Sequence, residues 1–320
     1  MSEKRIATRN SYGETLAELA PEYPDLVVLD ADLAGATMTK MFKAACPERF
    51  IDCGIAECNM LGIAAGLAAS GKKVFASSFA MFAAGRAFEI IRNSIGYPHL
   101  PVKICATHAG ISVGEDGASH QCCEDIALMR TIPGMTILNP SDDVEARSAI
   151  RAIVDFDGPV YVRLGRLAVP VINEGPDYHF ELGKGIELRK GKDVTILATG
   201  MMVAEALEAA SCLEKEGIDA RIINIHTIKP IDREIIRKAA EETGLLVTVE
   251  EHSVIGGFGS AVADVCAEEC PVRIVKIGMN DEFGCSGPAL ELLKKYGLSA
   301  EHIVKAVREA VAKKRLFTES

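Results

Sequence analysis

The run Leu26-Val27-Val28-Leu29-Asp30 decides the fold class of this 320-residue chain. Consecutive apolar residues that end in an acid are typical of a strand that is buried on both faces of a parallel sheet. Similar short runs recur downstream and alternate with helical patterns, the first of which cover 11–19 and 59–69. Strands that alternate with helices predict a parallel sheet with helices on both of its faces.

The same alternation predicts two α/β units. In the first unit, the remaining strands and helices fall at 73–76, 82–95, 102–106, 135–138, 141–155 and 160–163. In the second unit, they fall at 194–198, 202–216, 220–224, 245–250, 259–268, 272–275 and 300–313. Between the units, the Gly-, Asp-, Glu- and Lys-rich segment 173–192 is interpreted as a connector with a hairpin-like segment. We expect an α/β protein with two three-layer domains of parallel or mixed sheet, at 1–175 and 190–320.

Composition narrows the classes of partner and compartment. The formal net charge of −10 argues against nucleic acid and anionic membranes as partners. No apolar run is long enough to span a bilayer, and the first residues do not resemble a secretory signal. Ten irregularly spaced cysteines then indicate reduced thiols and a cytoplasmic protein. Their spacing does not match a zinc site, so we expect no metal ligands in this chain.

One carboxylate draws attention because of its neighbours. The stretch Gly54-Ile55-Ala56-Glu57-Cys58 precedes an apolar run of small residues up to Ala69, which predicts a buried helix that starts near Glu57. Apolar surroundings raise the pKa of a carboxyl group, and a protonated carboxyl can donate to a ligand nitrogen. The alternative is a first-turn glutamate that faces water and interacts with the helix dipole.

Several functional side chains follow predicted strands. Ligands bind outside the carboxyl ends of parallel strands, so one cleft is expected to hold six of these residues: Asp32, Glu57, His108, Asp116, His120 and Arg163. Arginine suits bidentate contact with phosphate, although a surface ion pair explains Arg9 and Arg163 equally well.

Two aromatic residues complete the pattern. Phe79 and Phe82 are three apart, which predicts that they share one helical face. Such a face could belong to the core, or it could stack on a flat heterocycle.

Together these motifs resemble a known family. They are the Gly-Ile-Ala-Glu sequence ending at Glu57, the Phe79-x-x-Phe82 pair, and the loop from Thr107-His108 to His120-Gln121. They are similar to the C-terminal half of transketolase, a thiamine-diphosphate enzyme, and the resemblance extends over the whole chain. It implies a pyrimidine-binding domain followed by a transketolase C-terminal domain.

The resemblance implies cofactor contacts. The glutamate that matches Glu57 bonds the aminopyrimidine ring of thiamine and helps to form the tautomer that deprotonates the thiazolium carbon. Phe79 and Phe82 match aromatic residues that pack on the pyrimidine. Asp32 matches an acid beside the cofactor at the subunit interface. The carbanion chemistry belongs to the cofactor.

The resemblance also implies substrate contacts. Asp116 matches an acid that contacts a sugar hydroxyl, and His120 matches a histidine beside the reacting carbons, so both are expected to be catalytic. Arg9, His108 and Arg163 match groups that hold the sugar phosphate.

Two positions depart from the family pattern. Gly85 stands where an aromatic residue is expected, and Ala36 stands where a serine is expected. The second departure weakens one phosphate contact, which leaves the preferred acceptor open.

The Gly-Asp-Gly motif with which the family binds diphosphate and Mg²⁺ is missing from this sequence. We therefore expect one subunit of a split transketolase of the pentose phosphate pathway. An N-terminal partner subunit would carry the diphosphate domain and the magnesium ligands. The expected assembly is a two-plus-two heterotetramer in which neither chain alone turns over sugar phosphates.

Three alternatives stay open. Deoxyxylulose-phosphate synthase and the beta subunits of 2-oxo acid dehydrogenases share this layout, and a non-catalytic assembly subunit could keep the fold without the chemistry. The spacing of Gly114-Glu115-Asp116-Gly117 and His120-Gln121, together with His108, favours transketolase.

Overall fold

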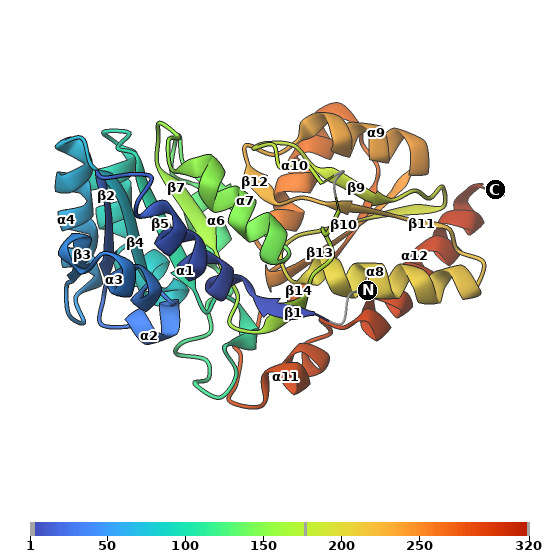
Figure 1. Ribbon diagram of the computed structural model, residues 1–320. Coiled ribbons are helices and arrows are strands. Elements are labelled where there is room, and N and C mark those ends of the chain that lie inside the picture. Colours follow the sequence, from blue (N-terminus) through green and yellow to red (C-terminus); the bar gives the residue numbers. More distant parts are fainter. Residues whose placement is uncertain (1–3, 176–177, 319–320) are drawn as a thin grey trace.

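The computed structural model describes residues 4–175 and 178–318 and shows two α/β domains side by side (Figure 1). The first is built on a seven-stranded sheet in the order β12-β6-β7-β5-β4-β2-β3, in which all neighbours are parallel except β12 and β6. Its strands are β2 (Leu26–Asp30), β3 (Phe50–Asp52), β4 (Lys73–Phe79), β5 (Val102–Thr107), β6 (Thr136–Leu138), β7 (Val160–Arg163) and β12 (Thr227–Lys229). The predicted α/β class is confirmed.

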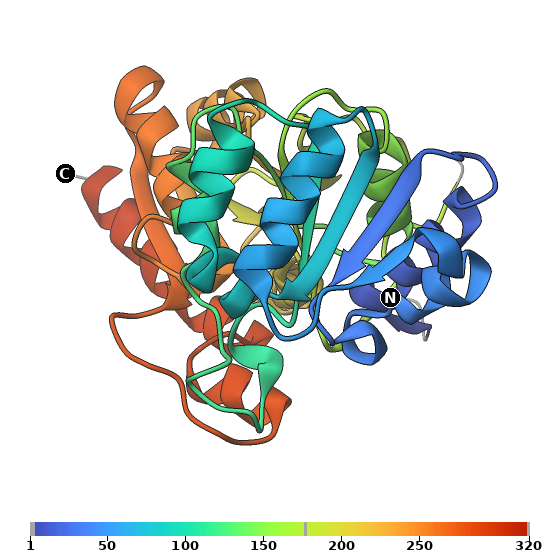
Figure 2. The same cartoon turned by 90° about the vertical axis from the view of Figure 1, so that its left-hand side faces the viewer.

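Helices cover both faces of this sheet because consecutive strand residues point to opposite sides. Val28 packs with Leu16 on one face, whereas Leu29 packs with Met60 on the other. Figure 2 shows α4 and the helical stretch 81–96 side by side on the second face. The helices are α1 (Thr8–Leu19), α2 (Ala34–Thr37), α3 (Lys40–Ala45), α4 (Glu57–Ala69), α5 (Phe88–Ile90), α6 (Asp125–Arg130) and α7 (Asp143–Ile153), with short 3-10 turns η1 (Pro47–Arg49) and η4 (Ile111–Val113).

The segment after β4 differs from its prediction. A single helix was expected over 82–95, but two π-helical stretches, η2 (Met81–Arg86) and η3 (Ile91–Gly96), flank α5. The strand β4 also continues through Phe79, so Phe79 and Phe82 do not share a helical face. A π-helix inserts an extra residue per turn and is frequent at functional sites, and this one carries Phe82 and Arg86.

The second domain has a five-stranded sheet in the order β14-β13-β10-β11-β9. The hairpin predicted in the connector is wrong: β9 pairs antiparallel with β11, where it covers an edge whose N–H and C=O groups need partners. The elements are β9 (Ile186–Arg189), β10 (Val194–Ala198), α8 (Met202–Lys215), β11 (Ala220–Asn224), α9 (Arg233–Thr243), β13 (Leu245–Ser253), α10 (Phe258–Glu269), β14 (Arg273–Met279), α11 (Ala289–Lys295) and α12 (Ala300–Thr318).

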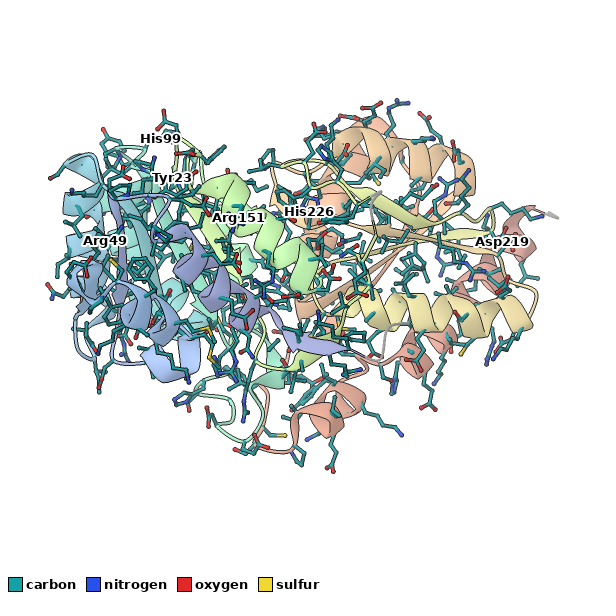
Figure 3. All side chains as sticks on the ribbon, viewed as in Figure 1. Tyr23, Arg49, His99, Arg151, Asp219 and His226 are labelled. Atoms are coloured by element: carbon teal, nitrogen blue, oxygen red, sulfur yellow. The ribbon has the colours of Figure 1, made fainter. Side chains whose placement is uncertain are left out.

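The interface between the two domains, called the seam below, is continuous with both cores. The strand β12 comes from the second half of the chain but pairs with β6 in the first sheet. The N–H of Asn139 donates to the carbonyl of His226 at 2.8 Å, and His226 lies at the seam in Figure 3. A small ribbon of β1 (Arg5–Ala7) and β8 (Ala168–Pro170) lies beside the first domain. No helix in the described part of the chain is long and apolar enough to cross a membrane.

Candidate active site

The carboxyl end of β2 is held by its last residue, Asp30. This buried carboxylate accepts hydrogen bonds from the Leu33 N–H at 2.6 Å and from the hydroxyls of Thr37 and Thr39 at 2.6 and 2.8 Å. Burial raises the pKa of Asp30, and the three donors oppose that rise. The turn that follows is therefore fixed, and it presents Asp32 at the edge of the sheet.

A second acid joins two loops at this edge. Asp32 and Gly54 both adopt left-handed backbone conformations, with φ of 60° and 69°. Both of their N–H groups donate to Oδ1 of Asp52, at 3.1 and 3.0 Å. Asp52 thus ties the loop that carries the exposed Asp32 to the residues that lead into α4, since β2 and β3 end side by side.

Glu57 begins α4 as predicted, and its side chain is only 2% exposed. The sequence had suggested apolar surroundings for Glu57, but in the structure a charged side chain contacts its carboxylate. The Arg86 guanidinium donates from Nη1 to Glu57 Oε2 at 2.9 Å, and its central carbon lies 4.8 Å from the centre of the Phe82 ring. A planar cation therefore contacts both a buried carboxylate and an aromatic face.

Four rings form a cluster beside this pair. Phe79 and Phe82 lie 6.4 Å apart between ring centres with nearly parallel planes. Phe79 also stacks on His108 at 4.0 Å, and the edge of Phe82 meets His120 at 5.1 Å. These contacts bring together residues from β4, η2 and the two ends of the loop between β5 and α6.

His108 is held in one state by its neighbours. Its backbone is left-handed, with φ of 56°, and such strain in a residue other than glycine is often found at functional sites. Burial, followed by the charges of Arg9 and Arg166, lowers the pKa of His108 to about 3, so the ring is neutral near pH 7. Arg9 Nη1 lies 3.4 Å from Nε2 and can only donate, so Nδ1 carries the proton toward the Thr107 hydroxyl at 2.9 Å.

Arg9, His108 and Arg166 form a positive group that fits an anion. The Arg9 guanidinium donates to the Ala36 carbonyl at 2.7 Å, and its buried Nε atom has no hydrogen-bond partner among the described residues. Burial and the charge of Arg166 lower the pKa of Arg9. Arg166 is itself paired with Glu115 at 2.9 Å. A dianion placed here would relieve the repulsion between the two guanidinium groups.

The structure contradicts the expected position of Arg163. Its side chain is buried in the seam, where Nε donates to Asp125 at 2.9 Å and Nη2 donates to the carbonyls of Cys122 and Glu251. Tyr161, two residues earlier on the same face of β7, donates to the same carboxylate oxygen at 2.9 Å. Arg166, three residues later, lies where Arg163 was expected.

Three predicted site residues lie at the margin of the aromatic cluster and the anion group. Asp116 is exposed on the loop, and among the described residues no hydrogen bond or ion pair joins its side chain to the aromatic cluster. His120 is half-buried, with Nδ1 at 3.0 Å from the Ser119 hydroxyl. Asp32 is exposed on the neighbouring loop. The edge of the first sheet therefore gathers most, but not all, of the predicted residues.

The two departures from the family pattern have local consequences. The carbonyl of Ala36 is an acceptor for Arg9, so this position still contributes to the anion group through its backbone. A side chain at Gly85 would collide with the terminal methyl group of Met81. Arg86, the next residue, covers the ring of Phe82.

Sequence reasoning missed Asp52, Arg86 and Arg166. No strand was predicted at 50–52, but Asp52 offered a signal, because it follows the apolar pair Phe50-Ile51 as Asp30 follows its apolar run. The positions of Arg86 and Arg166 depend on a π-helical turn and on the chain path after β7, which have no local sequence signal.

Glu57 and Phe82 offer an acceptor and an aromatic face side by side. The Arg86 guanidinium shows that one planar group with N–H donors can contact Glu57 and lie near Phe82 at the same time. Within the ranges described, no group of three or more potential metal ligands occurs.

Comparison with known proteins gives the family. The model of the transketolase pyrimidine-binding domain matches residues 4–171, and that of the transketolase C-terminal domain matches residues 183–303. The chain belongs to the transketolase family. Thiamine diphosphate and a divalent metal are therefore the cofactors of its family.

Two relatives and one solved structure are similar to this chain over nearly its whole length. The "Putative transketolase C-terminal section" of Methanocaldococcus jannaschii is 55% identical over 95% of this chain and 96% of that protein. The 6-deoxy-6-sulfo-D-fructose transketolase subunit SqwH of a Clostridium species is 46% identical, over 96% and 95% of the two chains. A solved structure described as a split gene transketolase, inactive beta4 tetramer, is 55% identical with a TM-score of 0.89, over 96% and 99%. The chain is thus similar to split transketolase subunits.

Proposed function

We propose that this chain is the C-terminal subunit of a split transketolase. It would transfer a two-carbon ketol unit from a ketose phosphate to an aldose phosphate with thiamine diphosphate. Residues 1–175 would be its pyrimidine-binding domain and residues 190–320 its C-terminal domain. The observation that carries the proposal is the placement of Glu57, Phe82 and Arg86, which offers a carboxylate and an aromatic face to one planar group.

In this proposal each site residue of the chain contacts either the cofactor or the sugar. When bound, thiamine diphosphate supplies a carbon nucleophile and an electron sink for cleavage beside a carbonyl. Glu57 would hold the pyrimidine nitrogen through its carboxyl group, with Phe79 and Phe82 packed on the ring and Asp32 beside it. The environment of Glu57 is buried, which strengthens such a hydrogen bond.

The loop residues would act on the sugar. His120, next to Phe82, is placed to exchange a proton with a hydroxyl near the reacting carbons. Asp116 would accept from another hydroxyl. Arg9, His108 and Arg166 would hold the phosphate, with neutral His108 accepting from Arg9 through Nε2 and so orienting the guanidinium. Sulfonate has a similar tetrahedral, anionic shape, and one relative is named for a sulfo-sugar, so a sulfonated donor is the second candidate substrate.

A partner subunit would complete the site. Ile55, two residues before Glu57, is 78% exposed, and a large apolar side chain exposed beside the site supports an interface there. The partner would bring the diphosphate domain and the Mg²⁺ ligands, giving a two-plus-two heterotetramer. All ten cysteines are free, which supports the cytoplasm as its compartment.

The decisive experiment is ketol transfer from xylulose phosphate to ribose phosphate with thiamine diphosphate and magnesium. The chain is assayed alone and after mixing with a candidate partner that carries a Gly-Asp-Gly motif. Activity only in the mixture is the expected result. Activity of the chain alone would contradict the shared site, and a stable but inactive complex would favour an assembly subunit or another donor. A matched mixture with sulfonated fructose distinguishes the two donor classes.

A further inference from the structure

The loop between β5 and α6 carries His108, Asp116 and His120. The N–H of Gly110 donates to the carbonyl of Cys122 at 2.8 Å and closes the loop at its base. Short turns link Gly114 to Gly117 and Gly117 to His120, with N···O distances of 3.1 and 3.0 Å. Neither sheet continues through the loop, so side chains from outside it add to this backbone frame.

A buried carboxylate of the second domain reaches into this loop. Oε1 of Glu251, on β13, accepts the N–H of Ser112 in η4 at 2.7 Å. Gly110, with φ of 82°, lies so close to the same carboxylate that a Cβ atom would collide with it. The Glu251 carbonyl accepts from Arg163 Nη2 at 2.8 Å. Arg163, which does not lie in the anion group, thus helps to hold Glu251 in place.

A second set of contacts holds the other end of the loop in place. Nε2 of Gln121 donates to the carbonyls of Ile111 at 3.3 Å and Gly114 at 3.2 Å within the loop, and to Cys285 of the second domain at 2.9 Å. Gly117, also left-handed, leaves no room for a side chain beside the Ser286 hydroxyl. The helix α11, which also belongs to the second domain, packs on η4.

Given the proposed function, we propose that the second domain is a positioning element of the active site. Glu251 fixes the start of the loop between β5 and α6, which we call the substrate loop. Gln121 holds the end of this loop against residues 285–286. The loop is thereby presented in one conformation, which sets where Asp116 and His120 stand relative to the cofactor face. Glu251 is a positioning residue and is not a catalytic one, because its carboxylate is buried against Ser112.

Hydrogen exchange of the isolated chain tests this without cofactor or partner. In Glu251→Ala, amides of residues 108–123 should exchange at least about tenfold faster, because a hydrogen bond to a charged acceptor is lost. Glu251→Gln keeps an acceptor oxygen and should restore most of the protection. Gln121→Met, which leaves Glu251 and its bond to Ser112 in place, should loosen the same segment if Glu251→Ala proves unstable.

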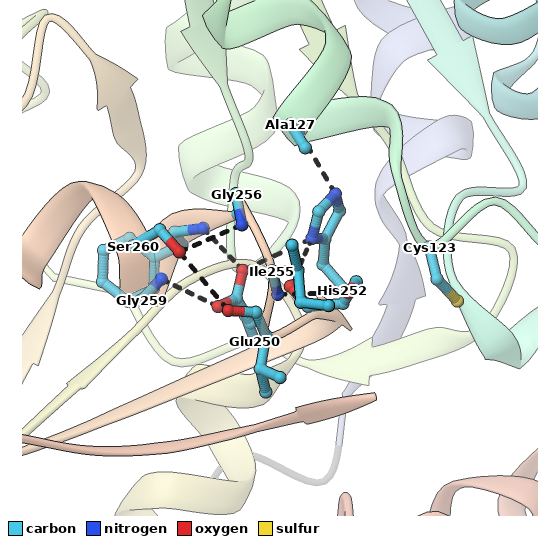
Figure 4. A network of polar contacts seen from close by, with 12 residues as sticks. Cys123, Ala127, Glu250, His252, Ile255, Gly256, Gly259 and Ser260 are labelled. Carbon is cyan, nitrogen blue, oxygen red and sulfur yellow. Dashed lines mark hydrogen bonds and ion pairs between the residues drawn. The ribbon is translucent and has the colours of Figure 1, made fainter. Parts of the chain in front are cut away.

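The neighbouring Glu250 provides the matched control. It is equally buried on β13, but it points to the other side and accepts the N–H groups of Phe258 and Gly259 at 2.6 and 2.7 Å (Figure 4). Glu250→Ala should speed exchange at the start of α10 and leave residues 108–123 at wild-type rates. Equal loosening of the loop in both variants, or none in Glu251→Ala and Gln121→Met, would overturn the proposal.

Kinetics in the mixed assembly separate positioning from the proposed function. Glu251→Ala should lower kcat by about 100-fold, as expected for a misplaced catalytic group. Exchange of the cofactor's thiazolium C2 proton, which depends on Glu57, should keep its wild-type rate. Loss of that exchange as well would overturn a role confined to the substrate loop. A wild-type mixture without ketol transfer would instead reject the proposed function, while the amide exchange still decides the positioning.

Discussion

The edge of the first sheet and the seam between the domains use the same kinds of charged side chain in opposite ways. At the edge, Arg9 leaves a buried nitrogen without a partner, and His108 and Asp32 adopt left-handed conformations. At the seam, Arg163 is bonded to Asp125 and to two carbonyls. At the edge, an arginine nitrogen without a partner and strained backbone lie where a ligand would bind, whereas at the seam the arginine is fully paired, even though Asp125 Oδ1 and His226 Nε2 have no hydrogen-bond partner among the described residues.

This difference predicts two kinds of mutational effect. Changes at the edge should alter activity or affinity and leave the free energy of unfolding nearly unchanged. Changes at the seam should lower that free energy first, because they leave a buried charge without its partner.

The largest effect is expected for Glu57→Gln at the edge. The amide keeps the size and a hydrogen bond to Arg86, but it cannot exchange a proton with the pyrimidine, so turnover of the mixed assembly should fall at least about 100-fold. Complex size, measured by sedimentation, should match the wild type. Unchanged turnover would instead identify the chain as an assembly subunit.

At the seam, Arg163→Leu should lower the free energy of unfolding by about 3–5 kcal/mol, because it leaves Asp125 buried and uncompensated. Denaturant unfolding measures this directly. The matched variant Arg166→Leu should unfold within about 1 kcal/mol of wild type, since its partner Glu115 is exposed. Similar losses in both variants would remove the contrast between edge and seam.

A pH effect is also expected at the seam. Burial lowers the pKa of His226 to about 4, so the folded state resists its protonation and the unfolded state does not. This contribution is present above pH 6.5 and declines as the pH falls toward 4, by about 3 kcal/mol in all. In His226→Asn, unfolding should depend less steeply on pH in this window than in His179→Asn, which changes an exposed histidine. If the free energy of unfolding depended equally on pH in the two variants, the expected contribution of His226 would be contradicted.

For the anion group, Arg166→Leu should raise the KM for a phosphorylated ketose by about 10- to 100-fold, the value of a hydrogen bond between charged groups. The KM for the same ketose without phosphate should stay at the wild-type value. Steady-state kinetics of the mixed assembly provide both numbers. An equal rise for both sugars would mean that Arg166 supports the fold of the loop and does not bind the anion.

The smallest effect is expected for Arg86→Ala. Arg86 occupies the carboxylate of Glu57 and the face of Phe82, so it competes with the cofactor ring. Its side chain is half exposed, so the pair contributes less than about 1 kcal/mol, and the Kd of thiamine diphosphate should fall by only a few-fold. Calorimetry on the mixed assembly measures the change. Weaker binding would show that Arg86 supports the cofactor.

Local pattern predicted the framework well. The strands at 26–30, 160–163 and 194–198 and the start of α4 at Glu57 follow from apolar runs and their spacing. The pattern failed where tertiary contacts override it. A π-helical turn replaced the regular helix at 81–86, and β9 paired with a strand that lies more than thirty residues away.

The sequence alone determined the α/β class and the family, because periodicity and motif spacing are local properties of the chain. Only the tertiary structure showed which arginine lies at the seam and which lies in the anion group. Arg163 shares a strand face with Tyr161 and is buried on Asp125, whereas Arg166 lies beyond the strand near Arg9 and His108. It also showed that Glu251 of the second domain accepts a hydrogen bond from Ser112 in the loop after β5, since the packing of two domains depends on contacts between residues far apart in the chain.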